Sequence, residues 1–136
     1  LLRGRYRERF LVVSHRWFTK GDPDPKGLKL QELQAFLQQH PSIEYVWVDF
    51  YCLPQAPRGD EDEKFFKASL AKINYLYLGM QVLVLYDQNY VGRFWTTYET
   101  FLATHQASIT GVVSGGERHF IQCIGASKVA GPANAE

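Results

Sequence analysis

Apolar runs alternate with amphipathic segments along most of this chain. The runs at residues 10–13, 45–51 and 81–86 are rich in β-branched and aromatic residues, which is typical of buried strands. Between and after them, apolar residues recur at three- and four-residue spacing, which predicts helices. The predicted order is strand, helix, strand, helix, strand, helix. This order indicates a parallel sheet with helices on its faces and right-handed crossovers.

The predicted helices have recognisable ends. The first stops before Pro41, because a residue that precedes proline avoids the helical conformation. The second begins with the acidic run 60–63, since negative charge is favoured near a helix N-terminus, and it ends at Gly79. The third spans residues 94 to about 105. We expect a single buried stripe along the second helix, with the members Phe66, Leu70, Ile73 and Tyr77.

The last third of the chain is less regular. Two short apolar runs, at residues 109–113 and 119–124, are compatible with a hairpin or with two edge strands joined by a loop. We expect a single domain over residues 1–136, with its core at about residues 8–124 and a flexible tail at 125–136. The chain begins on Leu1 without a methionine, so we expect it to be a piece of a longer protein.

Composition narrows the classes of function. The net charge of +1 gives no reason to expect nucleic acid or an acidic membrane surface as a partner. No apolar stretch approaches the roughly 18 residues that span a bilayer, and no signal peptide is recognisable. Two cysteines, Cys52 and Cys123, do not make a disulfide framework, so we expect a reducing, cytoplasmic setting. No ligand spacing of a familiar kind indicates a metal.

Polar and aromatic side chains follow the predicted strands at three places. Because the carboxyl ends of parallel strands open on one edge of a sheet, we expect these side chains to meet in one crevice. Glu99 lies one helical turn after Trp95, so the two share a helix face. The group comprises Ser14, His15, Arg16 and Trp17 after the first strand, Asp49 and Cys52 at the second, and Tyr90, Arg93, Trp95 and Glu99 after the third.

Most of these residues also have a purely structural interpretation. His15 fits a hydrogen-bonded residue at a strand end. Arg16 fits a ligand for phosphate or carboxylate, or equally a salt bridge with Asp49 or Glu99. Asp49 needs a partner if it is buried in an apolar strand. Glu99 alone would fit a solvated helix residue, and Cys52 could be a nucleophile with His15 as its base, although no local signature supports that pair.

Three motifs, taken in order, resemble the heterokaryon-incompatibility (HET) domain. They are Ser-His-Arg-Trp at residues 14–17, Trp-Val-Asp-Phe-Tyr-Cys-Leu-Pro-Gln at 47–55, and Arg-Phe-Trp-Thr-Thr-Tyr-Glu at 93–99. The HET family is similar in turn to Toll/interleukin-receptor (TIR) domains. Residues 82–99 look like the TIR strand–loop–helix block that carries the family's glutamate. The resemblance covers roughly residues 8 to 105.

The resemblance implies an α/β, flavodoxin-like, TIR-like three-layer fold with a mostly parallel central sheet of about five strands. Several TIR domains cleave NAD at the nicotinamide–ribose bond with the glutamate of this block, which would be Glu99 here. NAD or a related nucleotide would then be a substrate and not a bound cofactor. The implied substrate contacts are Ser14, Arg16, Trp17, Asp49, Tyr90, Arg93 and Trp95, with Trp17, Trp95 or Tyr90 stacking on a ring and Arg16 or Arg93 holding the pyrophosphate.

The resemblance also implies a role in immune or cell-death signalling and self-association with like domains. Many TIR and HET domains act mainly by self-association, so the alternative is a non-catalytic module that assembles and binds a nucleotide. The chain departs from the family pattern at Leu53-Pro54, at Phe94, which stands where a glycine is usual, and at Tyr98. We expect the bulky Phe94 to narrow or fill the pocket.

Overall fold

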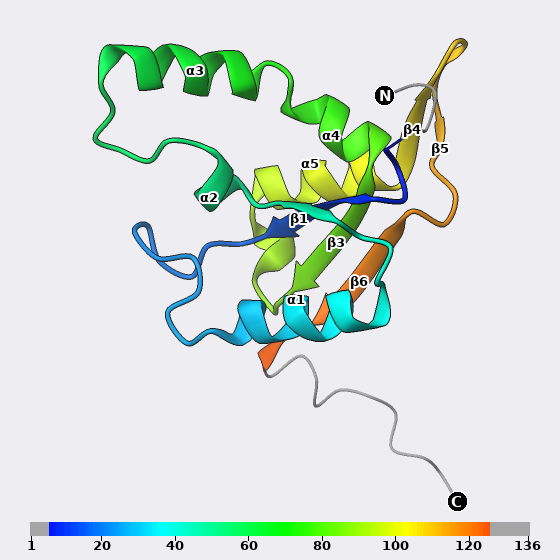
Figure 1. Ribbon diagram of the computed structural model, residues 1–136, viewed down its shortest axis with the longest axis horizontal. Helices are drawn as coiled ribbons and strands as arrows, with labels where there is room; N and C mark the ends of the chain where they lie inside the picture. Colours follow the sequence, from blue (N-terminus) through cyan, green and yellow to red (C-terminus); the bar gives the residue numbers. More distant parts are fainter. Residues whose placement is uncertain (1–5, 126–136) are drawn as a thin grey trace, which may run out of the picture.

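The computed structural model, which describes residues 6–125, is an α/β fold built on four parallel strands (Figure 1). The sheet order is β2-β1-β3-β6, which is compatible with a flavodoxin-like fold and has one strand fewer than expected. The strands of this sheet are β1 (Phe10–His15), β2 (Tyr45–Trp47), β3 (Gln81–Tyr86) and β6 (His119–Cys123). The helices are α1 (Leu28–Gln39), α2 (Asp49–Cys52), α3 (Asp60–Leu70), α4 (Ile73–Gly79), the 3-10 turn η1 (Tyr90–Gly92) and α5 (Phe94–Ala103).

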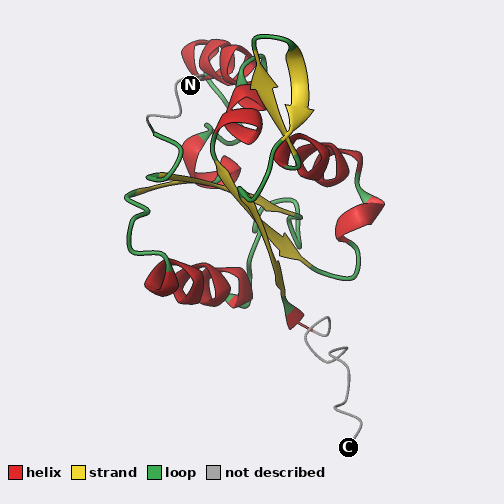
Figure 2. Cartoon of the chain, turned by 90° about the vertical axis from the view of Figure 1, so that its right-hand side faces the viewer, coloured by secondary structure: helices red, strands yellow, loops and turns green. Residues whose placement is uncertain are grey.

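Helices cover both faces of the sheet, and each face has its own core (Figure 2). β1 and β3 are central strands, and their continuous apolar sequences suit strands that are buried on two sides. On one face Leu11, Val13, Leu83 and Leu85 pack with Phe36 of α1. On the other face Val12, Val82 and Val84 pack with Tyr77 of α4 and with Leu102 and Ala103 of α5.

The sheet order creates the place where a ligand site is expected. The chain leaves β1 toward β2 on one side, and it leaves β3 toward β6 on the other side. In open α/β sheets, ligands bind outside the carboxyl ends of the strands at such a switch point. Strand alternation also places Ser14 on the same face as Val12, which is the face that α5 covers.

The second strand is much shorter than predicted. The sequence predicted a strand over residues 45–51 that is buried on both faces, and this prediction is wrong. β2 has three residues, lies at the sheet edge, and leaves Tyr45 50% exposed. Asp49 begins α2, where its Oδ1 accepts the N–H of Phe50 at 2.7 Å. A carboxylate is favoured in the first turn of a helix, so Asp49 ends the strand instead of lying within it.

The second predicted helix is two helices. The N–H of Lys72 bonds to the carbonyl of Ser69, three residues back, so the regular helical ladder stops between α3 and α4. The expected continuous stripe is therefore wrong, because Leu70 is 42% exposed. Tyr77 of α4 reaches the core.

The two apolar runs near the end of the chain, at residues 109–113 and 119–124, do not pair with each other. β5 (Gly111–Ser114) forms an antiparallel hairpin with β4 (His105–Ser108), apart from the main sheet. Ile109 lies at the tip of this hairpin and is 100% exposed. β6 instead pairs in parallel with β3. Residues 126–136 of the tail predicted at 125–136 lie outside the described residues. None of the helices in residues 6–125 is long and apolar enough to cross a membrane.

A buried arginine connects the ends of several elements. Arg118, just before β6, donates through Nη1 to the carbonyl of Met80 at 2.5 Å and through Nη2 to that of Leu102 at 2.7 Å. Nη2 also donates to the carbonyl of His105. A cation near the last carbonyls of α5 is favoured by the helix dipole. Arg118 thus joins the start of β3, the end of α5 and the hairpin.

We predict that Arg118→Met lowers the free energy of unfolding by about 3 kcal/mol, because it leaves buried carbonyls without donors. Urea denaturation of both proteins measures the difference. Arg9→Met is the matched control, since Arg9 pairs with Glu44 at the exposed surface and should change stability little. An equal loss in the two variants would contradict the prediction.

Candidate functional site

A cleft of about 820 Å³ opens beside the carboxyl end of β1 and the start of α5. Its walls come from the loop after β1, from α2 and the loop that follows, from α3 and α4, and from α5. The structure brings most of the predicted site residues to this cleft, namely Arg16, Trp17, Asp49, Arg93, Trp95 and Glu99. Ser14 and Tyr90 do not line it and lie beneath Glu99 instead.

Glu99 of α5 faces the cleft and is held from below. Its Oε2 accepts a hydrogen bond of 2.5 Å from Ser14 Oγ, and the Tyr77 hydroxyl is a second hydrogen-bond partner. Burial raises the pKa of the Glu99 carboxyl to about 7, and the charge of Asp49 adds to the rise, while the two hydrogen bonds act in the opposite direction. Glu99 is thus a carboxyl that changes its charge near neutral pH.

A chain of hydroxyl groups continues beneath Ser14. Tyr90 OH lies 2.5 Å from Ser14 Oγ and 3.0 Å from Thr100 Oγ1. Ser14 donates its single hydrogen to Glu99, so its contact with Tyr90 is a hydrogen bond only when Tyr90 donates, and the Tyr90 hydrogen is then withdrawn from the Thr96 carbonyl at 3.2 Å. Tyr90 is 1% exposed, and burial raises its pKa to about 12. Tyr90 therefore presents no ring face to the cleft and supports Glu99 through Ser14.

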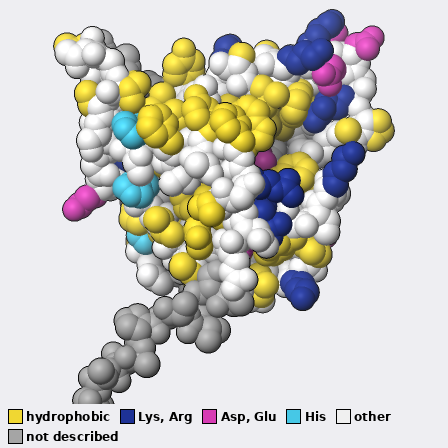
Figure 3. All heavy atoms as spheres, turned by 180° about the vertical axis from the view of Figure 1, so that it is seen from behind, with side chains coloured by type: hydrophobic (Ala, Val, Ile, Leu, Met, Phe, Trp, Pro, Cys, Tyr) yellow, Lys and Arg dark blue, Asp and Glu magenta, His cyan; other side chains and the backbone are white. Residues whose placement is uncertain are grey.

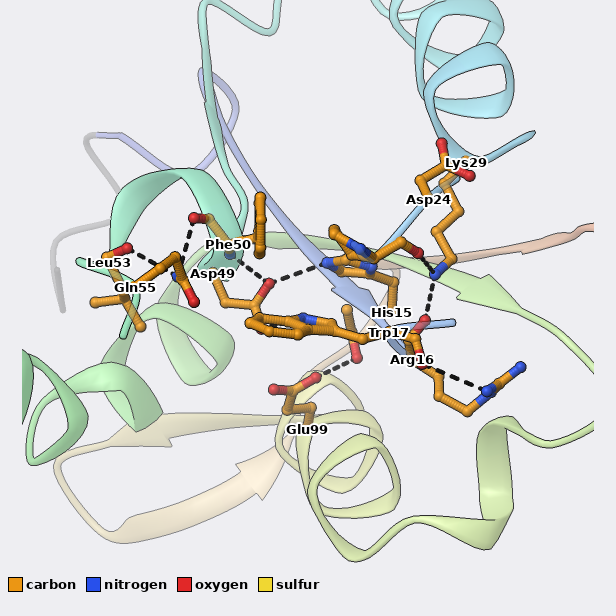
Figure 4. A network of polar contacts seen from close by, with 12 residues as sticks. His15, Arg16, Trp17, Asp24, Lys29, Asp49, Phe50, Leu53, Gln55 and Glu99 are labelled. Carbon is orange, nitrogen blue, oxygen red and sulfur yellow. Dashed lines mark hydrogen bonds and ion pairs between the residues drawn. The ribbon is translucent and has the colours of Figure 1, made fainter. Parts of the chain in front are cut away.

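Asp49 organises the opposite wall of the cleft (Figure 4). Its Oδ2 accepts from Trp17 Nε1 at 2.9 Å, and its Oδ1 lies 3.0 Å from His15 Nε2. With the N–H of Phe50, three protein groups surround this carboxylate. The expectation of a hydrogen-bonded His15 at the strand end agrees with this geometry. Asp49 fixes the imidazole and indole rings, and the buried Nδ1 of His15 has no partner among the described residues.

Arg16 forms a salt bridge, but with neither of the two expected partners. Its Nε lies 3.1 Å from both carboxylate oxygens of Asp87, the residue that follows β3. Its Nη1 is 3.4 Å from the carbonyl of Trp17. The guanidinium is thus anchored through its Nε edge, and Arg16 still lines the cleft.

Lys29, which has no distinguishing feature in the sequence, is buried and holds the loop after β1. Lys29 Nζ donates to the carbonyl of Pro23 at 2.5 Å and to that of Arg16, and it lies 3.8 Å from the ring centroid of Phe18. Burial lowers the pKa of Lys29 to about 8. Lys29 lies in the first turn of α1, at a position where a lysine is usually solvated. Its acceptors are backbone carbonyls of the loop after β1, and their positions are known only from the folded structure.

The mouth of the cleft is basic and aromatic. Arg93 and Lys20 line it and are exposed. Phe94 is 74% exposed and stacks on Tyr98 at a centroid distance of 5.8 Å with an interplanar angle of 7°. Of the two expectations for Phe94, that it fills the pocket is wrong, because its exposed ring lies at the rim, where it lines the cleft. Figure 3 shows Lys and Arg side chains gathered beside a band of hydrophobic side chains on one face.

Two other chemistries find no support in this geometry. Cys52 is exposed and does not line the cleft, and His15 Nε2 already faces Asp49, so no Cys–His pair is formed. Within residues 6–125, no three side chains of His, Cys, Asp or Glu gather in a way that could hold a metal ion.

Comparisons of the chain with protein-family models, with curated proteins and with solved structures found no match. The resemblance to HET and TIR domains therefore stays a prediction that rests on the three sequence motifs.

We predict that stability depends on pH through Glu99. The folded pKa of about 7 lies above the ordinary 4.5, so the folded state binds this proton more tightly than the unfolded chain. Binding of this proton adds up to about 3 kcal/mol to the free energy of unfolding. The full contribution is present below pH 4.5, and it is lost as the pH rises through about 7.

Glu99→Gln tests this dependence, because it removes the charge and keeps an oxygen that can accept from Ser14. At pH 8 the variant should unfold at higher urea concentration than the parent protein, and at pH 4 the two should match. The comparison cancels the contribution of the other carboxyls. A variant that is destabilised equally at both pH values would refute the prediction.

Proposed function

We propose that this chain is a TIR/HET-like effector domain that cleaves the nicotinamide–ribose bond of NAD, with Glu99 as the catalytic carboxylate. One observation carries the proposal: Glu99 lies in a cleft between aromatic walls and a basic mouth, with one oxygen held from beneath by Ser14. The order of the three motifs adds the specific link to NAD. A cytoplasmic role in immune or cell-death signalling belongs to the same proposal.

The cleft offers complementary groups for each part of a dinucleotide. Its volume of about 820 Å³ falls within the range of about 300–1,000 Å³ that is usual for ligand pockets. Exposed Arg93 and Lys20 suit a pyrophosphate. Trp17 and Trp95 offer rings on which a base can stack. The position of Glu99 suits the ribose that joins the base to the pyrophosphate.

The chemistry uses the charge of Glu99. When the bond between C1′ and the pyridinium nitrogen breaks, its electron pair goes to the nitrogen and nicotinamide leaves as a neutral molecule. The ribose becomes an oxocarbenium-like cation, which a nearby carboxylate stabilises. A water oxygen then bonds to C1′ and releases a proton, so NAD and water give ADP-ribose, nicotinamide and a proton. No separate general acid is needed.

We predict that the purified protein releases nicotinamide from NAD and that the rate rises with pH through about 7, as Glu99 ionises. Glu99→Gln should lower the rate by at least about a hundredfold. Glu117→Gln is the control, because Glu117 is exposed and lies outside the cleft. Product release is followed by chromatography over a range of protein concentrations, since catalytic TIR-like domains often work as oligomers.

Two results would sink the catalytic proposal. One is no nicotinamide release at any protein concentration, and the other is full activity in Glu99→Gln. Cys52→Ala should retain full activity, because Cys52 does not line the cleft. Loss of activity in that variant would instead favour a cysteine-dependent hydrolase.

A second candidate, from a different class, is a non-catalytic module that self-associates and binds a nucleotide. The observation that favours it is the exposure of two aromatic residues on α5. Trp95 is 64% exposed, and Phe101 is 52% exposed although its ring packs on His105. Exposed apolar patches of this kind often mark protein–protein contacts.

We predict that Phe101→Ser weakens self-association about tenfold or more, because burying a phenylalanine contributes about 2 kcal/mol to association. Sedimentation velocity over a concentration series measures the change. Phe65→Ser is the matched control, since Phe65 is similarly exposed but lies on α3. If both variants sediment like the parent protein, the α5 face is not the contact.

A further inference from the structure

The side-chain amide of Gln55 is held in one orientation. Its Nε2 donates to the carbonyls of Phe50 at 3.0 Å and Leu53 at 2.9 Å (Figure 4). Both partners are acceptors, so the NH₂ end must face them and the amide cannot be reversed. The carbonyl oxygen Oε1 therefore points away from these partners. No donor for Oε1 is found among the described residues, and Gln55 lines the cleft.

The part of the cleft around Gln55 is mostly apolar. The loop after α2 together with α3 and α4 contributes Leu53, Phe66, Leu70 and Ile73 to the cleft lining, and Arg58 and Asn74 as its charged and polar members. In Figure 4, Gln55 lies on the opposite side of Trp17 and Glu99 from Arg16. The cleft thus has an apolar half beside Gln55, whose Oε1 is an oriented acceptor, and on its other side lies Arg16, which is paired with Asp87.

The positive charge nearest to the apolar half already has partners. Arg58 Nε donates to the carbonyl of Pro54 at 2.6 Å, and Nη1 lies 3.5 Å from Glu63. Its guanidinium carbon lies 3.5 Å from the ring centroid of Phe66, so the guanidinium covers one face of this ring. Arg58 therefore contributes a stacking plane, and its ion pair reduces the attraction of this half for an anion.

We propose that this apolar half is a subsite for a planar ring that carries an exocyclic NH₂ group, with Gln55 Oε1 as its acceptor. The inference rests on the proposed function and specifies its substrate: in NAD the carboxamide of nicotinamide and the amine of adenine share this chemistry. The apolar walls and the Arg58 guanidinium, which is stacked on Phe66, bury the ring faces. Gln55 selects an N–H donor, because a ring with an oxygen there would place two acceptors in contact.

Binding of three dinucleotides to the Glu99→Gln protein tests the subsite, since this variant should not consume the ligand. NAD is compared by calorimetry with nicotinic acid adenine dinucleotide, which lacks the carboxamide NH₂, and with nicotinamide hypoxanthine dinucleotide, which lacks the adenine amine. One of the two analogues should bind at least tenfold more weakly than NAD. The weaker analogue identifies which ring occupies the subsite.

Adding Gln55→Leu should weaken NAD binding about tenfold and remove the preference between NAD and the weaker analogue. Gln122→Leu is the matched control, because Gln122 also donates a hydrogen bond, to Glu32 at 3.0 Å, and lies outside the cleft. Should Gln55→Leu fail to fold, the analogue series on the Glu99→Gln protein still decides. Equal affinity for all three dinucleotides there overturns the subsite.

The subsite and the proposed function can fail separately. Nicotinamide release by the parent protein, together with a preference that survives Gln55→Leu, overturns the subsite alone. Absence of release, together with a preference that depends on Gln55, overturns NAD cleavage and supports the subsite. No binding of any dinucleotide overturns both.

Discussion

The hydrogen bond between Ser14 and Glu99 joins the central sheet to α5 at the point where the cleft forms. It requires Ser14 to lie on the α5 face of β1, which the alternation of the strand provides, and it requires α5 to start close to the end of β3. Tyr90 in the turn between them supports Ser14 from below. β1, η1 and α5 are therefore joined by hydrogen bonds among Ser14, Tyr90 and Glu99, next to the apolar core on this face of the sheet.

Burial of Glu99 at this contact destabilises its ionised form. A carboxyl withdrawn from water resists ionisation, which is why the pKa of Glu99 rises to about 7 although two hydroxyl groups bond to it. Asp49, on the other wall, is surrounded by three protein groups and has a supporting role for His15 and Trp17. Two carboxyls in one cleft thus differ in environment, as is typical of sites where one carboxyl reacts and another positions.

The sequence predicts best what depends on long apolar runs. β1 and β3 were predicted because strands buried on both faces have continuous apolar sequences. β2 was overextended because residues 45–51 have the same apolar pattern whether the chain continues as a strand or turns into a helix at Asp49. Lys29 and Arg118 were missed because these residue types usually lie in solvent. Their acceptors are backbone carbonyls, which carry no signature in the sequence.

The meeting of the three motifs at one cleft could be predicted from the parallel order of the strands alone. The partner of each side chain could not be predicted in this way. Arg16 pairs with Asp87, and Tyr90 lies below the cleft, because side-chain partners depend on the distances between layers. The two candidate functions, NAD cleavage and nucleotide binding without catalysis, differ in the charge that they require on Glu99. Cleavage of NAD needs the ionised Glu99, which stabilises a cation, whereas a module that only binds nucleotides could equally use the protonated form as a hydrogen-bond donor. A pKa near neutrality makes both forms accessible, so the dependence of binding and of turnover on pH distinguishes a catalytic carboxylate from a recognition group.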